Sequence, residues 1–265
     1  MSNIKLAIIG GSGLDDPRIL KDAEEKTVAT PYGKTSSSLT CGKINGVETV
    51  ILARHGKAHT IPPTQVPFRA NLWALKELDC THLIATTACG SLKEEIRPRD
   101  FVFLDQFIDM TKHRNLTFFE DFEEKIVHTP MAEPFCPQLR QALIETARQL
   151  GLTHHQSGTV VTIEGPRFST KAESNFFRLI GGDVINMSTV PEVILARELG
   201  LCYASVAMAT DYDCWRTGEE AVTWEMISRI MKDNAENVKK LLLAVVGKIS
   251  WDKCEHCGVT PAEAG

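Results

Sequence analysis

LAIIGGSG (residues 6–13) joins a run of apolar residues to a glycine-rich turn. The apolar run is typical of a buried strand, and the turn exposes backbone N–H groups and the Ser12 hydroxyl, which can hold a small anion. The turn lacks the third glycine of a dinucleotide-binding loop, and Asp15, Asp16 and Pro17 interrupt the expected helix. No Gly-Lys-Ser/Thr follows, so it is not a P-loop either. The stretch favours a small free anion, with a tight turn without a ligand as the alternative.

Short apolar runs alternate with segments of helical periodicity along the rest of the chain. The runs predict strands at residues 5–10, 48–54, 81–87, 101–107, 158–165, 182–187 and 201–211. The periodic segments predict helices at residues 68–78, 136–151, 188–200 and 222–246. Thr189 and Glu192 have the spacing of a capping box at the start of the third helix. This alternation indicates an α/β fold around a mainly parallel sheet, in a single domain over residues 1–265 with a loosely held tail from about residue 252.

Composition and charge narrow the class of protein. The chain has 265 residues, of which 43% are hydrophobic and 24% are charged, as in an ordinary globular protein. A net charge of −5 gives no general attraction to nucleic acid or to an anionic membrane. The chain has no apolar run of membrane-spanning length, and its first residues do not have the pattern of a signal peptide. We therefore expect a cytoplasmic protein that binds neither nucleic acid nor membranes.

The chain contains eight cysteines, two of which form the motif CEHC at Cys254 and Cys257. A zinc ribbon needs a second pair with similar spacing, and the sequence has none. A terminal disulfide or two free thiols are the alternatives for this pair. We expect no metal ligands, and we expect most of the other cysteines to be buried thiols.

Five predicted strands end in small, polar or charged residues, in GGSG, ARHG, TTACGS, MST and TDYD. In open α/β sheets ligands bind beyond the carboxyl ends of the strands, so we expect these ends to form one site. Arg54 offers a planar fork of donors suited to phosphate, with His55 beside it. Thr87 and Ala88 supply a hydroxyl and turn N–H groups, and Ser188 begins a helix, where an anion is favoured. Together these residues predict a pocket for free phosphate.

TDYDCW (residues 210–215) contributes two acids at the end of an apolar strand. Asp211 and Asp213 are two residues apart, so on an extended strand they face the same side. Such a pair is costly to bury unless it binds something, and each carboxylate raises the pKa of the other. One acid could then donate a proton to a basic ring nitrogen while the other accepts from an exocyclic amine. A helix cap or an internal salt bridge is the alternative.

Eight stretches, in order along nearly the whole chain, resemble the 5′-methylthioadenosine phosphorylases of the trimeric purine nucleoside phosphorylase class. They are IIGGSGLDDP (8–17), LARHG (52–56), CTHLIATTACGSL (80–92), DQFID (105–109), HTPMAEPFC (128–136), TIEGPRFST (162–170), NMSTVPEVILA (186–196) and MATDYDCW (208–215). The resemblance implies a mixed central sheet and reversible phosphorolysis of S-methyl-5′-thioadenosine to adenine and 5-methylthioribose 1-phosphate, in purine and methionine salvage. It also implies orthophosphate as co-substrate, no metal or organic cofactor, and a homotrimer or dimer of trimers with active sites between subunits.

The resemblance also implies roles for individual residues. The phosphate site would consist of Ser12, Arg54, His55, Thr87, Ala88 and Ser188. The catalytic residues would be Asp211, facing purine N7, and Ser188. The substrate site would include Phe168 on the base, Met187 under the ribose, Thr210, Asp213 near the 6-position, and His128 from a neighbouring subunit. We expect the helix that follows TDYDCW to wall the 5′ pocket with Trp224 and Ile227.

Other functions remain open at this point. Trp224 stands where many relatives have a small aliphatic residue, so the sequence leaves open a broader acceptance of adenosine or inosine. The main alternative is a broad or 6-oxopurine nucleoside phosphorylase acting on inosine, guanosine or methylthioinosine, and Asp213 argues against a strict 6-oxo preference. A nucleosidase would use water instead of phosphate. A purine-binding protein without turnover and an NAD-dependent dehydrogenase are the remaining alternatives.

Overall fold

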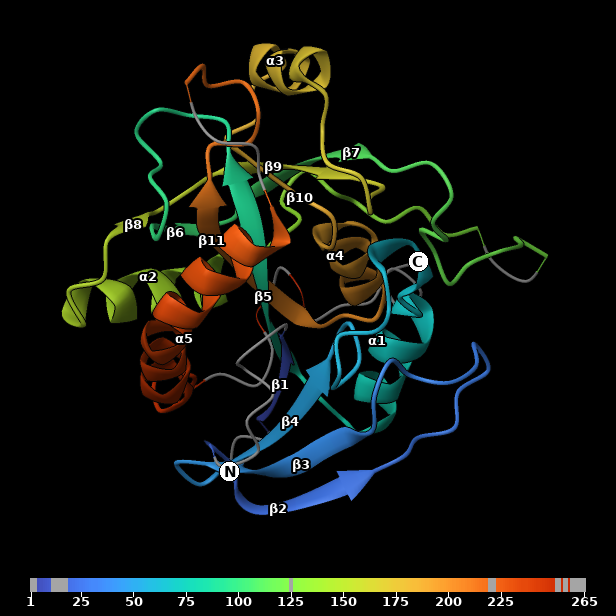
Figure 1. Ribbon diagram of the computed structural model, residues 1–265. Coiled ribbons are helices and arrows are strands. Elements are labelled where there is room, and N and C mark those ends of the chain that lie inside the picture. The colour runs from blue at the N-terminus through green and yellow to red at the C-terminus, as the bar shows by residue number, and fades with distance from the viewer. Residues whose placement is uncertain are drawn as a thin grey trace.

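The computed structural model describes residues 4–10, 19–123, 126–218 and 223–250, together with Cys254 and Cys257. These residues form an α/β fold in which helices cover both faces of a central sheet (Figure 1). The sheet contains parallel and antiparallel pairs, which confirms the predicted mixed class. Within the described part of the chain, no helix is long and apolar enough to cross a membrane.

The described residues contribute eleven strands to the sheet. The strands are β1 (Lys5–Gly10), β2 (Lys21–Lys26), β3 (Leu39–Ile44), β4 (Val47–Ala53), β5 (His82–Ser91), β6 (Phe101–Phe103), β7 (Gln106–Met110), β8 (His154–His155), β9 (Thr159–Ile163), β10 (Val184–Asn186) and β11 (Cys202–Asp211). The order is β2-β3-β4-β1-β5-β10-β9-β7; β11 pairs with β5 and β6, and β8 pairs with β6. The parallel pairs β1–β4, β1–β5 and β5–β11 bring the carboxyl ends of these four strands to the same edge.

Both faces of the sheet are apolar, as β1 illustrates. Ala7 and Ile9 pack in one core cluster and Leu6 and Ile8 in another, because successive side chains point to opposite faces of a strand. The first face is covered by α1 (Phe68–Glu77) and α4 (Thr189–Glu198), and the second by α2 (Pro137–Gln149) and α5 (Trp224–Val246). A strand buried on both faces has no polar side, which explains the continuous apolar runs in the sequence.

All four predicted helices are present, and α5 is one continuous helix. The strand predicted at residues 101–107 is two strands, because β6 pairs with β11 whereas β7 pairs with β9. The sequence did not indicate β2, whose six residues are all exposed at the sheet edge. It did not indicate β3 or the short β8 either. It also missed α3 (Lys171–Leu179), in which the buried residues are Ser174 and Phe177, too few to form a wide apolar face.

The predicted capping box of Thr189 and Glu192 is wrong. Ser188 is the N-cap of α4 and makes no capping hydrogen bond with its side chain. The Glu192 carboxylate is buried and pairs with Arg54, so it is not free to reach back to the helix start. Of the tail from residue 252, Cys254 and Cys257 are described, and both are buried; the rest of that prediction lies outside the described residues.

Candidate active site

A cavity of about 520 Å³ opens where β4, β5 and β11 end and where α4 and α5 begin. Its volume lies in the range of small-molecule sites. Twelve of the predicted site residues line it: Arg54, His55, Thr87, Ala88, Phe168, Met187, Ser188, Thr210, Asp211, Asp213, Trp224 and Ile227. The polar strand ends therefore meet at one cavity, as the sequence predicts.

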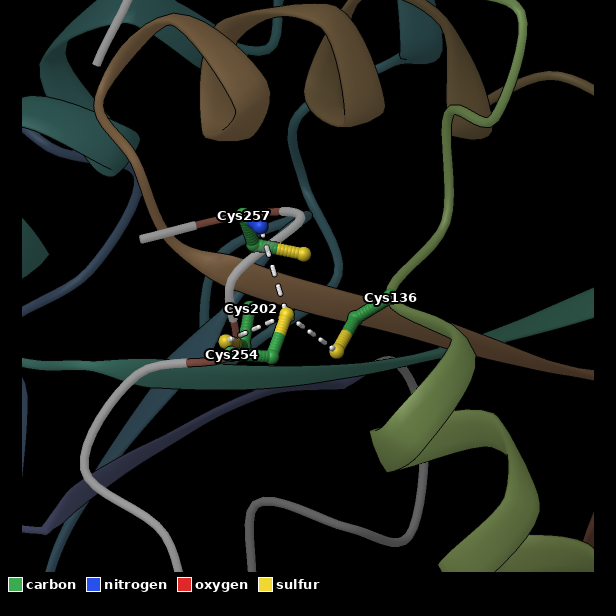
Figure 2. Close-up of side chains that lie close together, drawn as sticks. All are labelled: Cys136, Cys202, Cys254 and Cys257. Carbon is green, nitrogen blue, oxygen red and sulfur yellow. Dashed lines mark hydrogen bonds between the residues drawn. The ribbon is translucent and has the colours of Figure 1, made fainter. Parts of the chain in front are cut away.

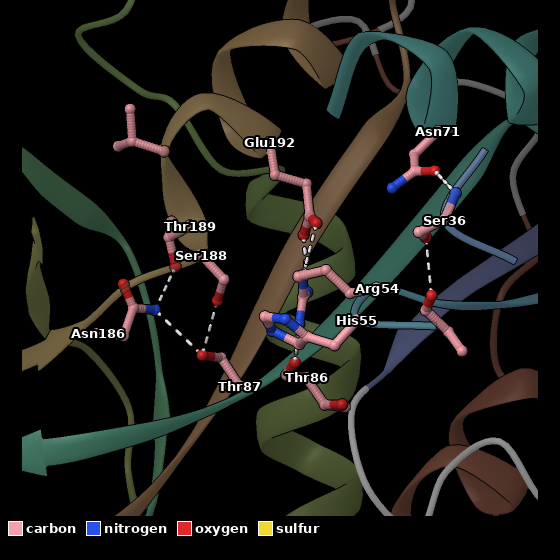
Figure 3. A network of polar contacts seen from close by, with 12 residues as sticks. Ser36, Arg54, His55, Asn71, Thr86, Thr87, Asn186, Ser188, Thr189 and Glu192 are labelled. Carbon is pink, nitrogen blue, oxygen red and sulfur yellow. Dashed lines mark hydrogen bonds and ion pairs between the residues drawn. The ribbon is translucent and has the colours of Figure 1, made fainter. Parts of the chain in front are cut away.

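Thr87 and Ser188 form what we call the hydroxyl corner of the cavity (Figure 3). Thr87 Oγ1 lies 2.9 Å from Ser188 Oγ. Asn186 Nδ2 donates to Thr87 Oγ1 at 3.2 Å and to Thr189 Oγ1 at 2.7 Å, and Asn186 Oδ1 accepts from Thr162. Ser188 is also the N-cap of α4, but Val190 in the first turn is non-helical, so the corner offers an anion two positioned hydroxyls rather than a regular helix N-terminus.

Arg54 is buried beside this corner and also lines the cavity, and three of its five N–H groups are hydrogen-bonded. Its Nε donates to Glu192 Oε2 at 2.8 Å and its Nη2 to Glu192 Oε1 at 2.9 Å, while Nη1 donates to the carbonyl oxygen of Thr86 at 2.9 Å (Figure 3). Tyr203 also donates to Glu192. The sequence predicts Arg54 as the cation of a phosphate pocket; in the structure its charge is balanced by a buried carboxylate.

His55 lies next to Arg54 and is held in one tautomer. Its Nδ1 is 2.9 Å from the carbonyl oxygen of Ile61, which can only accept, so Nδ1 carries the proton. Burial, followed by the charge of Arg54, lowers the pKa of His55 to about 4. The imidazole is therefore neutral near neutral pH, and its Nε2 is a hydrogen-bond acceptor.

Thr210, Asp211 and Asp213 form the acidic end of the cavity. Thr210 Oγ1 donates to Asp211 Oδ2 at 2.6 Å, and the Asp213 backbone N–H donates to Asp211 Oδ1 at 2.7 Å. Asp213 adopts a left-handed backbone with φ of +50°, an uncommon conformation for a residue other than glycine. Its Oδ2 is buried and has no hydrogen-bond partner among the described residues.

Burial makes both acids hold their protons more tightly than free carboxyl groups. It is the largest cause that raises the pKa of Asp211 to about 6, and the charge of Asp213 adds to it. Burial likewise raises the pKa of Asp213. An acid with a pKa near neutrality is suited to general acid catalysis.

Apolar and aromatic side chains wall the space between the two polar ends. Phe168 lines the cavity with 43% of its surface exposed, and Met187 lines it from the segment before α4. Gly165 makes room for Met187, since a Cβ at this position would collide with Met187 Sδ. At the start of α5, the Trp224 ring packs 4.9 Å from the ring of His59, which is 4.7 Å from that of His55.

Two predicted site residues are not at this cavity. Ser12 lies outside the described residues. His128 is exposed, packs against the ring of Phe122 at 5.5 Å, and does not line the cavity of its own chain.

Sequence reasoning missed Glu192 and Asn186 as parts of the site. Both are buried and hydrogen-bond to predicted site residues. Glu192 could have been found, because it is an acid among apolar residues in STVPEVILARELG and has to be buried with a partner. Asn186 gives no such signal, since its partners come from β5, β9 and α4.

Potential metal ligands gather elsewhere in the described part of the chain. Their one group there consists of four cysteines, none of which lines the cavity. That the site uses no metal or organic cofactor stays a prediction.

Three comparisons with known proteins agree with this geometry. The family described as the phosphorylase superfamily matches residues 5–247. The S-methyl-5′-thioadenosine phosphorylase of Danio rerio is 56% identical over 257 residues, which cover 95% of this chain and 92% of that protein. The enzyme of the same name from Xenopus tropicalis is 56% identical over 93% of this chain and 89% of its own.

Solved structures give the same result. The methylthioadenosine phosphorylase of Schistosoma mansoni in complex with adenine has a TM-score of 0.88 and 46% identity, over 93% of this chain and 92% of that chain. A mutant of the Schistosoma mansoni adenosine/methylthioadenosine phosphorylase in complex with methylthioadenosine has a TM-score of 0.87 and 44% identity, over 93% and 91%. The chain belongs to the phosphorylase superfamily and, within it, to the S-methyl-5′-thioadenosine phosphorylase family.

Proposed function

We propose that this chain catalyses the reversible phosphorolysis of S-methyl-5′-thioadenosine to adenine and 5-methylthioribose 1-phosphate, a salvage reaction. The observation that carries this proposal is that one cavity holds an anion-binding corner at one end and Asp211, with a pKa of about 6, at the other. The names of the relatives, and the adenine and methylthioadenosine in the solved ones, support the same reaction.

The reaction separates charge across the cavity. The bond from C1′ to N9 breaks with its electron pair going to the purine, while an oxygen of orthophosphate forms the new bond to C1′. The hydroxyls of Thr87 and Ser188 donate to phosphate oxygens, and neutral His55 Nε2 accepts the P–OH hydrogen. Asp211 gives its proton to N7 and so stabilises the charge on the leaving purine.

The acidic end accounts for a preference for 6-aminopurines. With N7 at Asp211, the 6-substituent faces Asp213, whose buried Oδ2 lacks a partner among the described residues. This oxygen accepts a hydrogen bond from a 6-amino group, whereas a 6-oxo group has no hydrogen to donate. Phe168 stacks on the base. The broad or 6-oxopurine phosphorylase is therefore not favoured.

The start of α5 accounts for the 5′ substituent. Trp224, Ile227 and Met231 line the cavity there and offer an apolar wall to a methylthio group. A 5′-hydroxyl would lose part of its hydration against these apolar side chains, although Ser228 also lines the cavity there. This difference favours methylthioadenosine over adenosine, although one solved relative is named for both.

The enzyme in this proposal is a homotrimer or a dimer of trimers. Leu116, Phe122 and Ile126 are large apolar side chains that are exposed in the segment between β7 and α2. Exposed apolar side chains gathered in one segment are typical of an interface. A neighbouring subunit on this surface would bring His128 towards the 5′ end of its ribose site. Light scattering coupled to size-exclusion chromatography tests the subunit number.

The proposal includes no metal or organic cofactor in the reaction, with orthophosphate as the co-substrate. It also places the protein in the cytoplasm. The cysteines are free thiols, and free thiols persist in a reducing compartment.

The test is purine release from methylthioadenosine, adenosine and inosine, each with and without phosphate. Phosphate-dependent release of adenine, fastest from methylthioadenosine, is the expected result. Release without phosphate would identify a nucleosidase, and faster cleavage of inosine would identify a 6-oxopurine phosphorylase. Binding without turnover would leave only a purine-binding protein, and NAD-dependent oxidation would indicate a dehydrogenase.

A further inference from the structure

Four cysteines from distant parts of the sequence meet in a buried cluster (Figure 2). Cys136 is the N-cap of α2, Cys202 is the first residue of β11, and Cys254 and Cys257 follow α5. Their Sγ atoms all lie within 4.8 Å of one another. At most 4% of any of these residues is exposed, so no solvent separates the sulfurs. We call this group the cysteine cluster.

The spacing of the sulfurs differs from that of disulfides. Cys136 Sγ is 3.5 Å and Cys202 Sγ is 3.8 Å from Cys254 Sγ, and all four cysteines are free thiols. A disulfide would bring two sulfurs to about 2.05 Å. Four thiolates around Zn²⁺, each at about 2.3 Å, lie about 3.8 Å apart along the edges of a tetrahedron. The cluster is therefore close to the ligand arrangement of a tetrahedral metal site.

Backbone N–H groups donate to two of the four sulfurs. The Cys257 backbone N–H lies 3.2 Å from Cys254 Sγ, and the Leu139 backbone N–H lies 3.4 Å from Cys136 Sγ. Cys136 also stands at a helix N-terminus, where negative charge is favoured. Such donors orient metal-bound thiolates and spread their charge.

We propose that the cysteine cluster is a structural tetrathiolate site for Zn²⁺. Binding displaces one proton from each thiol, and four sulfurs fill the tetrahedral positions with none left for water, as in structural rather than catalytic zinc sites. The CEHC motif supplies two ligands, and the fold supplies the other two from α2 and β11. The sequence predicts no metal site because it has no second cysteine pair with the spacing of CEHC. This arrangement does not need such a pair.

The position of the cluster separates its effect from that of the active site. Cys202 and Asp211 are the two ends of β11, about 30 Å apart at the rise of an extended strand. Zinc would fasten the segment after α5 to α2 and β11. Loss of zinc should therefore lower the thermal stability and leave the KM values for both substrates within about twofold.

The first experiment measures metal in the full-length enzyme, expressed with added zinc and purified without a strong chelator. Elemental analysis should give about one zinc per chain. Enzyme produced with Co²⁺ instead should show the sulfur-to-metal charge-transfer absorption and the intense visible bands of tetrahedral cobalt thiolates. Neither measurement depends on a variant that folds.

Variants then locate the metal. Cys202→Ser and Cys257→Ser should each lose most of the zinc and lower the Tm by about 5–10 °C. Cys41→Ser is the matched control, because Cys41 is also buried but lies in β3, outside the cluster. It should keep the zinc of the wild type.

Several results would overturn the proposal. They are zinc far below one per chain after growth with added metal, bound cobalt without sulfur charge transfer, and equal zinc loss in Cys41→Ser. A disulfide within the cluster, found by mass spectrometry of the unreduced enzyme, would also contradict it. Because zinc content is measured without substrate, none of these results bears on the proposed phosphorolysis.

Discussion

The two ends of the cavity respond to burial in opposite directions. At the proposed phosphate end, which comprises His55, Arg54 and the hydroxyl corner, burial is the largest cause that lowers the pKa of His55 to about 4. At the acidic end, it is the largest cause that raises the pKa of Asp211 to about 6. In each case removal from water penalises the charged form, which is the cation of histidine and the anion of aspartate. One physical cause thus leaves an acceptor at one end and a proton donor at the other.

The ends also differ in how completely their polar groups are paired. Arg54 makes three hydrogen bonds, two of them to Glu192, and Thr87 and Ser188 are joined to each other. At the acidic end, Asp213 Oδ2 has no partner within the described residues. A paired network is rigid and stabilising, whereas an unpaired buried oxygen costs stability until a ligand donates to it. In the proposed function, the hydroxyl corner with Arg54 therefore positions the phosphate, and the acidic end reacts with and recognises the purine.

The largest effect should come from Asp211→Asn. Amides do not donate a proton to N7, so we predict that kcat/KM for methylthioadenosine falls by about 10²–10³ near pH 6 while the fold is kept. Asp79→Asn is the matched control, because Asp79 is exposed in the turn after α1. Activity of Asp211→Asn within about threefold of the control would show that Asp211 is not the acid.

Glu192→Gln should have the next largest effect, on stability. It leaves the Arg54 charge buried without its counterion, and we predict a loss of about 3 kcal/mol in the free energy of unfolding and a higher KM for phosphate. Glu198→Gln is the control on the same helix, because Glu198 is buried but accepts from Thr117 and the Phe118 backbone rather than from an arginine. Equal losses in denaturant unfolding of the two variants would mean that the ion pair has no special role.

The opposite pKa shifts predict opposite pH dependences of stability. His55 binds its proton more weakly in the folded state than in the unfolded state. Its contribution to the stability of the fold is therefore present above about pH 6.5 and is lost as the pH falls towards about 4. Asp211 binds its proton more tightly, so its contribution is present below about pH 4 and is lost as the pH rises through about 6.

Two variants separate these contributions. As the pH rises from about 4 to 6.5, the free energy of unfolding of the wild type should increase by about 2–3 kcal/mol relative to that of His55→Asn. As the pH rises from about 4 to 6, the free energy of unfolding of the wild type should decrease by a similar amount relative to that of Asp211→Asn. Denaturant unfolding at several pH values measures both slopes, and slopes of the same sign would contradict the comparison.

The smallest effect should come from single hydroxyls. Thr87→Val removes a donor from the hydroxyl corner, and we predict a rise in the KM for phosphate of about tenfold, with the KM for methylthioadenosine nearly unchanged. The control is Thr40→Val, since Thr40 is also buried but lies in β3 and does not line the cavity. A similar rise in both variants would place the phosphate elsewhere.

Much of this site could be predicted from the sequence because its residues stand at strand ends. A buried apolar run that stops at ARHG, TTACGS or TDYD indicates both a strand and the edge at which it ends. The four helices could be predicted because each covers a face of the sheet and so carries a regular apolar stripe. β2 could not, because all six of its residues are exposed and an exposed edge strand has no apolar pattern.

Pairing between distant segments was not predictable. Glu192 has the spacing of a capping residue, but its carboxylate pairs instead with buried Arg54, which is 138 residues away in the sequence. The cysteine cluster was missed for a similar reason. Its sulfurs come from α2, β11 and the segment after α5, and local spacing in the chain carries no information about their meeting.

The most direct test of this account is the pH dependence of kcat/KM for methylthioadenosine, measured for the wild type and for Asp211→Asn at saturating phosphate. The ratio of the two cancels the ionisation of phosphate and of every group that they share. The account predicts a ratio that is highest below about pH 6 and falls about tenfold per pH unit above it, because Asp211 acts in its protonated form. A ratio that does not change with pH, or that rises with it, would contradict the role of Asp211 as the proton donor.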